Sequence, residues 1–145
     1  MRIIRAGEIR LHYSMKQAID AMERAFTSLS STECHIPMRV VTRLPADDLL
    51  LLYKPAFVAK DRKVTVKFLT QRERTMIPGI PAIQGIIIVI DSITGEILSV
   101  MDGGNITALR TGAASGLATR LFAGKEANTM ALFGCGAQGK TQIEA

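Results

Sequence analysis

The sequence predicts an α/β protein whose larger part is an α+β domain with a mixed sheet. Three observations support this prediction. An amphipathic helix pattern begins near residue 15, short β-prone runs follow from Met38 to Met101, and an apolar run at residues 129–133 leads directly into a glycine-rich loop. The last feature is typical of the first strand and turn of a second α/β unit.

The composition is that of a globular protein with a basic surface. The 145 residues are 48% hydrophobic and carry a formal net charge of +5. The apolar runs are far shorter than the roughly 20 residues that a membrane-spanning helix needs, and the charged N-terminus does not resemble a secretory signal. The basic residues are scattered rather than grouped with aromatic side chains, which argues against binding to nucleic acid. We expect a cytoplasmic protein that binds neither membranes nor nucleic acid.

Cysteine and histidine do not form a metal-binding pattern in this chain. Cys34 and Cys135 lie far apart in the sequence, and His12 and His35 add no ligand spacing. We therefore expect neither a structural metal site nor a disulfide framework.

The first helix is predicted from a capping pattern and a hydrophobic period. Ser14 to Gln17 matches a capping box. Apolar residues then recur every three or four positions, at Met15, Ala18, Ile19, Met22, Ala25, Phe26 and Leu29. The helix should fade in the polar stretch Ser28 to Thr32, because hydroxyl side chains compete for backbone hydrogen bonds, and Pro37 prevents its continuation.

Five β-prone runs predict the strands of one sheet. They are Arg39–Leu44, Leu49–Tyr53, Val64–Leu69, Gly85–Ile90 and Ile97–Met101. Between the last two runs, Asp91 can start a turn and Gly95 can take a positive φ angle, so these runs should form a hairpin. The Pro-Gly-Ile-Pro sequence within residues 77–81 predicts a rigid loop beside the sheet.

A second helix is predicted from about Asn105 to Phe122, with Asn105 as its cap and Gly124 as its stop. Its side chains are unusually small at Ala108, Gly112, Ala113, Ala114, Ser115, Gly116 and Ala118. A glycine inside a helix costs roughly 0.5–1 kcal/mol relative to alanine. We therefore expect another backbone or a ligand to approach this helix closely.

The C-terminal segment carries the most specific motif. The predicted buried strand Thr129–Phe133 runs into Gly134-Cys135-Gly136-Ala137-Gln138-Gly139, after which residues 140–145 can begin a helix. A strand, a Gly-x-Gly-x-x-Gly loop and a helix in this order are the fingerprint of a dinucleotide-binding turn in a Rossmann fold. Gly134 would permit the sharp turn, Gly136 the close approach of a pyrophosphate, and Gly139 tight helix packing. The alternative is a glycine-rich turn that binds no ligand.

The Rossmann unit is expected to be truncated in this chain. The acidic residue that binds the ribose in such folds follows about 20 residues after the loop, which places it beyond Ala145. One strand and half a helix cannot form a doubly wound sheet, so residues 1–145 alone should not hold a dinucleotide with useful affinity.

Three cations are candidates for binding an anionic substrate. Arg110 shares a predicted helix face with apolar residues, which suggests a bound carboxylate or phosphate, with a structural ion pair as the alternative. Lys67 alternates with Val66 and Phe68 in a predicted strand, where an exposed lysine is the simpler interpretation. Arg39 has no local signal beyond that of a solvated arginine.

Taken together, these motifs resemble the ornithine cyclodeaminase/mu-crystallin family. The resemblance rests on Ile106-Thr107-Ala108-Leu109-Arg110-Thr111-Gly112-Ala113-Ala114-Ser115 and on the loop at residues 134–139. Shorter pieces occur in the family's order, namely Pro37-Met38-Arg39, Tyr53-Lys54-Pro55-Ala56, Val66-Lys67-Phe68, Gly79-Ile80-Pro81, Thr94-Gly95-Glu96 and Met101-Asp102-Gly103.

The resemblance implies two domains and a set of site residues. Residues 1–123 would form a substrate-binding and dimerisation domain, and residues 124–145 would begin an NAD(P)-binding Rossmann domain in a homodimer. Arg39, Lys67 and Arg110 would bind the substrate's α-carboxylate. The dinucleotide, NAD or NADP, would contact Thr111, Gly134, Gly136, Ala137, Gln138 and Gly139. The family's catalytic aspartate would lie beyond Ala145, so no catalytic acid or base is assigned within the chain.

The resemblance also implies a reaction, with alternatives that differ in class. The first hypothesis is conversion of L-ornithine to L-proline and ammonia, by removal and return of a hydride. The alternatives are an amino-acid dehydrogenase or ketimine reductase, and a non-catalytic mu-crystallin-like protein that binds NADPH or another ligand. In ornithine cyclodeaminases an acidic residue occurs where this chain has Leu51 or Leu52, a methionine where it has Lys54, and a threonine where it has Ala82. The departures at Leu51, Leu52 and Lys54 speak against ornithine as the substrate. The departure at Ala82 concerns a contact near the cofactor, which would have to come from the backbone.

Overall fold

The computed structural model describes residues 1–31, 33–73 and 77–145. Thr32, the last residue of the predicted polar stretch, lies outside the described residues. The described chain divides into two compact units. The first contains residues 1–6 and 28–104, and the second contains residues 7–27 and 105–145.

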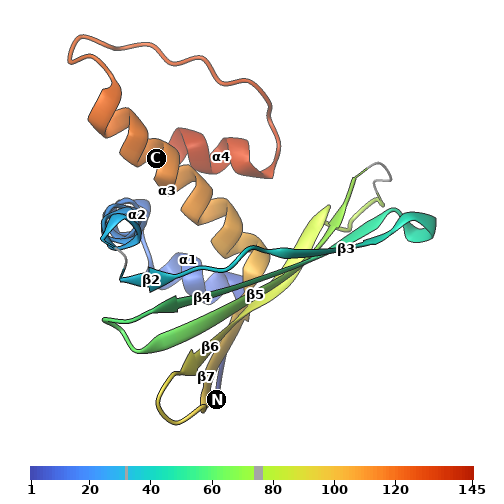
Figure 1. The fold of residues 1–145 in the computed structure, drawn as a ribbon. Helices are drawn as coiled ribbons and strands as arrows, with labels where there is room; N and C mark the ends of the chain where they lie inside the picture. Colours follow the sequence, from blue (N-terminus) through green and yellow to red (C-terminus); the bar gives the residue numbers. More distant parts are fainter. Residues whose placement is uncertain (32, 74–76) are drawn as a thin grey trace. The chain divides into compact units, whose positions relative to one another are not determined.

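The first unit contains a mixed sheet that is labelled in Figure 1. Seven strands occur among the described residues, namely β1 (Arg2–Ile4), β2 (Cys34–His35), β3 (Val40–Leu44), β4 (Leu49–Val58), β5 (Lys63–Arg72), β6 (Ile83–Asp91) and β7 (Ile97–Asp102). Their order is β1-β7-β6-β5-β4-β2, and β3 also pairs with β4. The pair β1–β7 is parallel and the other pairs are antiparallel. The predicted α/β class with a mixed sheet is confirmed.

All five predicted strands form, and the central ones are longer than predicted. The strands β4 and β5 pair in one continuous register from Leu49 opposite Arg72 to Val58 opposite Lys63. The sequence pattern failed to extend β4 because Lys54 and Pro55 interrupt its apolar run. The strand β4 nevertheless continues past Lys54 and Pro55 because it pairs with β5, and a ladder of backbone hydrogen bonds depends little on side-chain polarity. A short 3₁₀ turn at Pro45–Asp47 connects β3 to β4.

The predicted hairpin between β6 and β7 is confirmed, and one carboxylate organises its turn. Asp91 Oδ1 accepts hydrogen bonds from the backbone N–H groups of Ile93 (2.9 Å) and Thr94 (3.2 Å). Gly95 takes a φ of 74° and donates its N–H to the carbonyl of Asp91 at 2.9 Å. The other carboxylate oxygen accepts a 2.8 Å bond from Lys63 Nζ on β5. The ammonium group and the two backbone donors lower the pKa of Asp91 from 3.8 to about 2.

The predicted loop at residues 77–81 contains a tight turn. The N–H of Ile80 donates to the carbonyl of Ile77 at 3.0 Å, and Gly79 has a φ of 77°. Proline followed by a residue with positive φ is the pattern of a type II turn. Pro78 and Gly79 therefore occupy the two central positions that their backbone preferences suit.

The second unit is helical, with a small core between α2 and α3. Its helices are α1 (Ala6–His12), α2 (Met15–Ser30), α3 (Gly103–Phe122) and α4 (Ala137–Glu144), of which α1, α2 and α3 extend slightly into the first unit's residues. Buried Met15, Ala18 and Ala113 form the core cluster, with Ile19, Met22 and Leu109 packed against it. The N-terminal half of the predicted apolar face, from Met15 to Met22, packs in this core, whereas Ala25, Phe26 and Leu29 are exposed.

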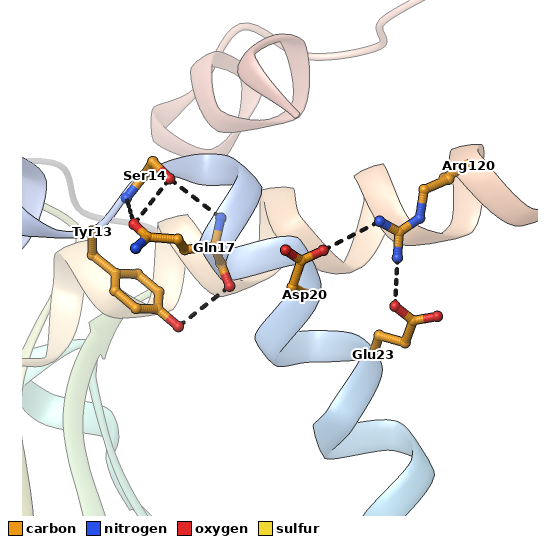
Figure 2. A network of polar contacts seen from close by, with 6 residues as sticks. All are labelled: Tyr13, Ser14, Gln17, Asp20, Glu23 and Arg120. Carbon is orange, nitrogen blue, oxygen red and sulfur yellow. Dashed lines mark hydrogen bonds and ion pairs between the residues drawn. The ribbon is translucent and has the colours of Figure 1, made fainter.

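Polar contacts fix the start of α2 and connect it to α3 (Figure 2). The N–H of Ser14 donates to Gln17 Oε1 at 2.9 Å, and Ser14 Oγ accepts from the N–H of Gln17 at 3.3 Å, which confirms the capping box. Further along, Arg120 on α3 contacts Asp20 at 3.3 Å and Glu23 at 2.7 Å, both on α2. All three side chains of this ion-pair network are about half exposed, so solvent screens it.

Two local predictions are wrong. The helix α3 begins at Gly103, directly after β7, so Asn105 lies in its first turn rather than at its cap. The segment Thr129–Phe133 is not a strand: residues 127–135 have no regular structure and are exposed, and Figure 1 draws them within a long loop between α3 and α4. A strand needs a neighbouring strand to satisfy its N–H and C=O groups. The described residues offer this apolar segment no such neighbour.

Three elements were not predicted. The strand β1, the helix α1 and the two-residue strand β2 lie in stretches whose hydrophobic pattern is too short to recognise. The strand β1 forms because Arg2–Ile4 pairs in parallel with Ser99–Met101 of β7, a partner about a hundred residues away in sequence.

Candidate functional site

The glycine loop has a defined geometry even though the segment before it is irregular. Gly134 has a φ of 97°, a conformation that side chains with a Cβ disfavour. Gly139 is buried, and a Cβ added to it would lie 2.9 Å from the carbonyl oxygen of Gly134. The third glycine of the motif therefore lets α4 pack directly on the turn, as its position in the motif predicted.

The start of α4 offers a cradle that suits a phosphate group. Gly136 is the N-cap residue, no side chain caps the helix, and the first turn contains no acidic residue. A Cβ added to Gly134 or to Gly136 would meet no atom within 4 Å, so space is open on this side of the loop. Backbone N–H groups at a helix start, together with the helix dipole, favour an anion. These residues fit the pyrophosphate of a dinucleotide.

The small residues of α3 accommodate α4, as the sequence predicted for a close approach by another backbone. A Cβ added to Gly112 would lie 2.6 Å from the carbonyl carbon of Thr141 and 2.7 Å from its Cβ. Gly116 is similarly restricted, with Ala145 Cβ at 2.8 Å and Ile19 Cδ1 at 2.9 Å. The two helices can approach this closely because α3 lacks side chains at these positions.

Thr141 joins α4 to α3 through its hydroxyl. Its side chain is 1% exposed, and Oγ1 lies 3.0 Å from the carbonyl oxygen of Ala108 on α3 and 2.8 Å from that of Gln138 within α4. The single hydroxyl proton can be donated to either carbonyl. This contact therefore ties α4, the helix that follows the glycine loop, to the helix that carries Arg110 and Thr111.

The predicted site residues of α3 lie on its N-terminal half. Arg110 is exposed in the described chain, so its guanidinium is not buried with the apolar stripe that the helix pattern suggested. Thr111 is half-buried, and its hydroxyl donates to the carbonyl of Thr107 at 2.6 Å. The hydroxyl of Thr107 itself is buried and has no hydrogen-bond partner among the described residues. A phosphate or carboxylate oxygen is the kind of acceptor that such a hydroxyl lacks.

The remaining predicted cations belong to the sheet. Lys67 lies in the middle of β5 and is half-buried, and Arg39 directly precedes β3 and is exposed. One strand, β4, separates them, and Lys54 on β4 pairs directly with Lys67. Sequence reasoning noted Lys54 as a departure from the family but could not place it beside Lys67, because that requires the register of β4 and β5.

Two further features of the described residues bear on other classes of function. No helix among them is long and apolar enough to cross a membrane. They also contain no group of three or more His, Cys, Asp or Glu side chains that could hold a metal ion.

Comparison with known proteins finds relatives that are amino-acid dehydrogenases or imino-acid reductases. The alanine dehydrogenase of Archaeoglobus fulgidus is 30% identical over 143 residues, which are 99% of this chain and 43% of that protein. The Δ1-pyrroline-2-carboxylate reductase of Thermococcus litoralis, solved with NADH and L-proline, is 31% identical with a TM-score of 0.93, over 99% of this chain and 44% of its own. An archaeal alanine dehydrogenase dimer solved with bound NAD is 28% identical with a TM-score of 0.90, and the match covers 99% of this chain and 44% of that chain.

These relatives are all longer than this chain. The chain spans less than half the length of each. The sequence model of the ornithine cyclodeaminase/mu-crystallin family matches residues 2–145. The glycine loop, the helix α3 with Arg110 and Thr111, and the mixed sheet all fall within this match. The chain therefore belongs to the ornithine cyclodeaminase/mu-crystallin family.

Proposed function

We propose that the whole protein, meaning the complete polypeptide that carries residues 1–145, is an NAD(P)-dependent enzyme of amino-acid metabolism. In this proposal it transfers a hydride between the dinucleotide and the α-carbon of an amino or imino acid. The observation that carries the proposal is the uncapped start of α4, with open space at Gly134 and Gly136, in a chain of this family. Relatives that were solved with NADH or NAD support the choice of cofactor.

The residues have separate roles in this proposal. Backbone N–H groups at Gly136 to Gln138 bind the pyrophosphate, and Thr111 contacts the same cofactor. Arg39, Lys67 and Arg110 bind the α-carboxylate of the substrate. The cofactor supplies the hydride acceptor or donor, and the protein orients the substrate's α-carbon toward it, which is a large part of catalysis in such reactions.

Dehydrogenase or imino-acid reductase chemistry is the first candidate reaction. The named relatives are a dehydrogenase and a reductase, and Leu51, Leu52 and Lys54 offer no negative charge for the side-chain ammonium of ornithine. Conversion of ornithine to proline with release of ammonia is the second candidate, supported by the family match. For residues 1–145 on their own we expect no turnover.

A substrate panel separates these possibilities. The whole protein would be assayed with NADH and Δ1-pyrroline-2-carboxylate, with NADH, pyruvate and ammonium, and with L-ornithine and catalytic NAD. Consumption of NADH supports the reductase or dehydrogenase, whereas proline and ammonia without net NADH support the cyclodeaminase. Tight NADPH binding without turnover of any of these compounds would favour a mu-crystallin-like binding protein.

Arg110 provides the test of the carboxylate-binding site. Arg110→Met should raise the KM for the amino or imino acid by about 10- to 100-fold, because one charge-assisted hydrogen bond is lost, while the Kd for NADH changes little. Arg120→Met is the matched control, since Arg120 lies ten residues later on α3 and pairs with α2. Equal effects of the two substitutions on KM would contradict the assignment of Arg110.

We further propose that the whole protein is a homodimer. The archaeal alanine dehydrogenase was solved as a dimer, and Met38, Val40 and Val41, on and before the edge strand β3, are exposed apolar residues. Light scattering after size-exclusion chromatography would test this, and a monomeric mass at micromolar concentration would contradict it.

A further inference from the structure

The residue that follows the glycine loop is a lysine with no role in the proposed function so far. Together with the next residue, Lys140 completes the spacing Gly-x-x-x-x-Gly-Lys-Thr from Gly134 to Thr141. This spacing is the pattern of a phosphate-binding P-loop, in which the lysine contacts the phosphates and the following hydroxyl binds Mg²⁺. The segment thus matches two nucleotide-binding motifs at once, and its geometry separates them.

The hydroxyl that would bind Mg²⁺ in a P-loop is occupied by structural contacts in this chain. Thr141 is 1% exposed. Its Oγ1 lies 3.0 Å from the carbonyl oxygen of Ala108 on α3 and 2.8 Å from that of Gln138 in α4. These contacts hold the hydroxyl inside the packing of α4 on α3. We therefore expect phosphate binding at this loop to be independent of Mg²⁺.

Lys140 remains accessible although both of its neighbours are buried. Gly139 packs against the glycine turn and Thr141 against α3, whereas the lysine between them is exposed. It lies at the end of the first turn of α4, which begins at Ala137. Side chains on a helix lean toward its N-terminus, and one turn rises about 5.4 Å. The long side chain of Lys140 can therefore reach back to the N–H groups at the helix start.

The charge of Lys140 is not neutralised by an acidic side chain among the described residues. The first turn of α4 contains no acidic residue, and Lys140 forms no ion pair with Glu144 one turn later. The helix dipole disfavours a cation near a helix start, so Lys140 destabilises α4 when no ligand is bound. An anion at the uncapped N–H groups reverses this effect, because the N–H groups and the ammonium group then attract the same charge.

We propose that Lys140 is a further cofactor-binding residue, whose ammonium group binds the pyrophosphate of the dinucleotide without a metal ion. This inference rests on the proposed function and deepens it. The backbone N–H groups of the loop fix the position of the pyrophosphate, and Lys140 adds affinity as a flexible point charge. The substrate's α-carboxylate is assigned to other cations, so a change at Lys140 acts on the cofactor alone.

The first test measures cofactor binding by the whole protein. Lys140→Met should raise the Kd and the KM for NADH by about 10-fold, the effect of one exposed charge-assisted contact, and change kcat and the substrate KM by less than about twofold. Lys140→Arg should keep most of the affinity. The affinity of the wild type should fall more steeply with salt than that of Lys140→Met, and EDTA should not alter it. Lys125→Met is the matched control, because Lys125 is an exposed lysine in the loop between α3 and α4.

A second test requires no turnover. Inorganic pyrophosphate, titrated in the presence of EDTA, should bind the wild type and Lys125→Met more tightly than Lys140→Met. Without ligand, Lys140→Met should be at least as stable as the wild type, because the unfavourable charge at the helix start is gone. Absence of any amino-acid or imino-acid turnover would refute the proposed function, while the titration would still decide the role of Lys140. Equal affinities of the wild type and Lys140→Met for these probes, or binding that requires Mg²⁺, would overturn the inference.

Discussion

Gly112→Ala should detach α4 from α3, although alanine is the better helix former. The added Cβ would lie 2.6 Å from the carbonyl carbon of Thr141, whereas carbon atoms in contact are about 3.5–4.0 Å apart, so α4 must retreat by about 1 Å. The obstacle is backbone and cannot rotate away. Overpacking of this kind costs about 2 kcal/mol. The retreat also weakens the contact between Thr141 Oγ1 and Ala108.

The helix propensity of alanine does not cancel this cost. The gain of about 0.5–1 kcal/mol stabilises α3 whether α4 is docked or not. The clash therefore acts in full on the equilibrium between docked and undocked α4. A change of about 2 kcal/mol corresponds to roughly a 30-fold increase in the undocked population of α4.

Hydrogen exchange of residues 137–145 measures this population. The variant should exchange roughly 30-fold faster there, with smaller changes in α2. Gly7→Ala is the matched control, because Gly7 is also helical and an added Cβ there meets nothing within 4 Å. Unchanged exchange in residues 137–145 of Gly112→Ala would refute the close contact between the two helices.

Three further predictions concern stability. For Asp91, the folded pKa of about 2 lies below the ordinary 3.8, so its contribution to the free energy of unfolding is present above about pH 4 and is lost as pH falls toward 2. Asp91→Asn should therefore make the urea-unfolding midpoint depend less on pH over this range, and Lys63→Met should do the same. Ser14→Ala removes the acceptor for the N–H of Gln17 and should lower the free energy of unfolding by about 1 kcal/mol, whereas Ser14→Asp should preserve it. Arg120→Met should cost less than about 1 kcal/mol in dilute buffer and nothing measurable in concentrated salt.

Each of these predictions can fail in a specific way. A variant of Asp91 that keeps the wild-type acid dependence would show that other carboxylates dominate it. A stability loss at Arg120 that persists in concentrated salt would indicate packing by its aliphatic stem rather than ion pairing. Equal losses for Ser14→Ala and Ser14→Asp would argue against the capping hydrogen bond.

The elements that follow from local chemistry could be predicted from the sequence. The capping box at Ser14, the hydrophobic period of α2 and the turn at Asp91 each involve residues within a few positions of one another. The strand β1 could not be predicted, because its partner β7 is about a hundred residues away. The failure at Thr129–Phe133 has the same origin: its apolar residues favour a strand, but a strand forms only with a neighbour to pair with.

The candidate site divides in the same way. The glycine spacing at residues 134–139 and the small residues of α3 predicted a tight turn and a close backbone approach, and both occur. The sequence could not show that the approaching group is α4 with Thr141, because Thr141 and its partner Ala108 are 33 residues apart. That Lys54 lies beside Lys67 also depends on the pairing of β4 with β5, which no one-dimensional pattern shows.

The long loop between α3 and α4 has a practical consequence for handling the protein. Within this loop Phe133 is 94% exposed and Met130 is 61% exposed, and Phe122 at the end of α3 is 84% exposed. An irregular apolar stretch of this kind is a preferred site for proteases and for self-association. A cut within it would leave α4 attached through Thr141 and the glycine faces of α3, so a preparation could be nicked and still migrate as an intact particle until it is denatured.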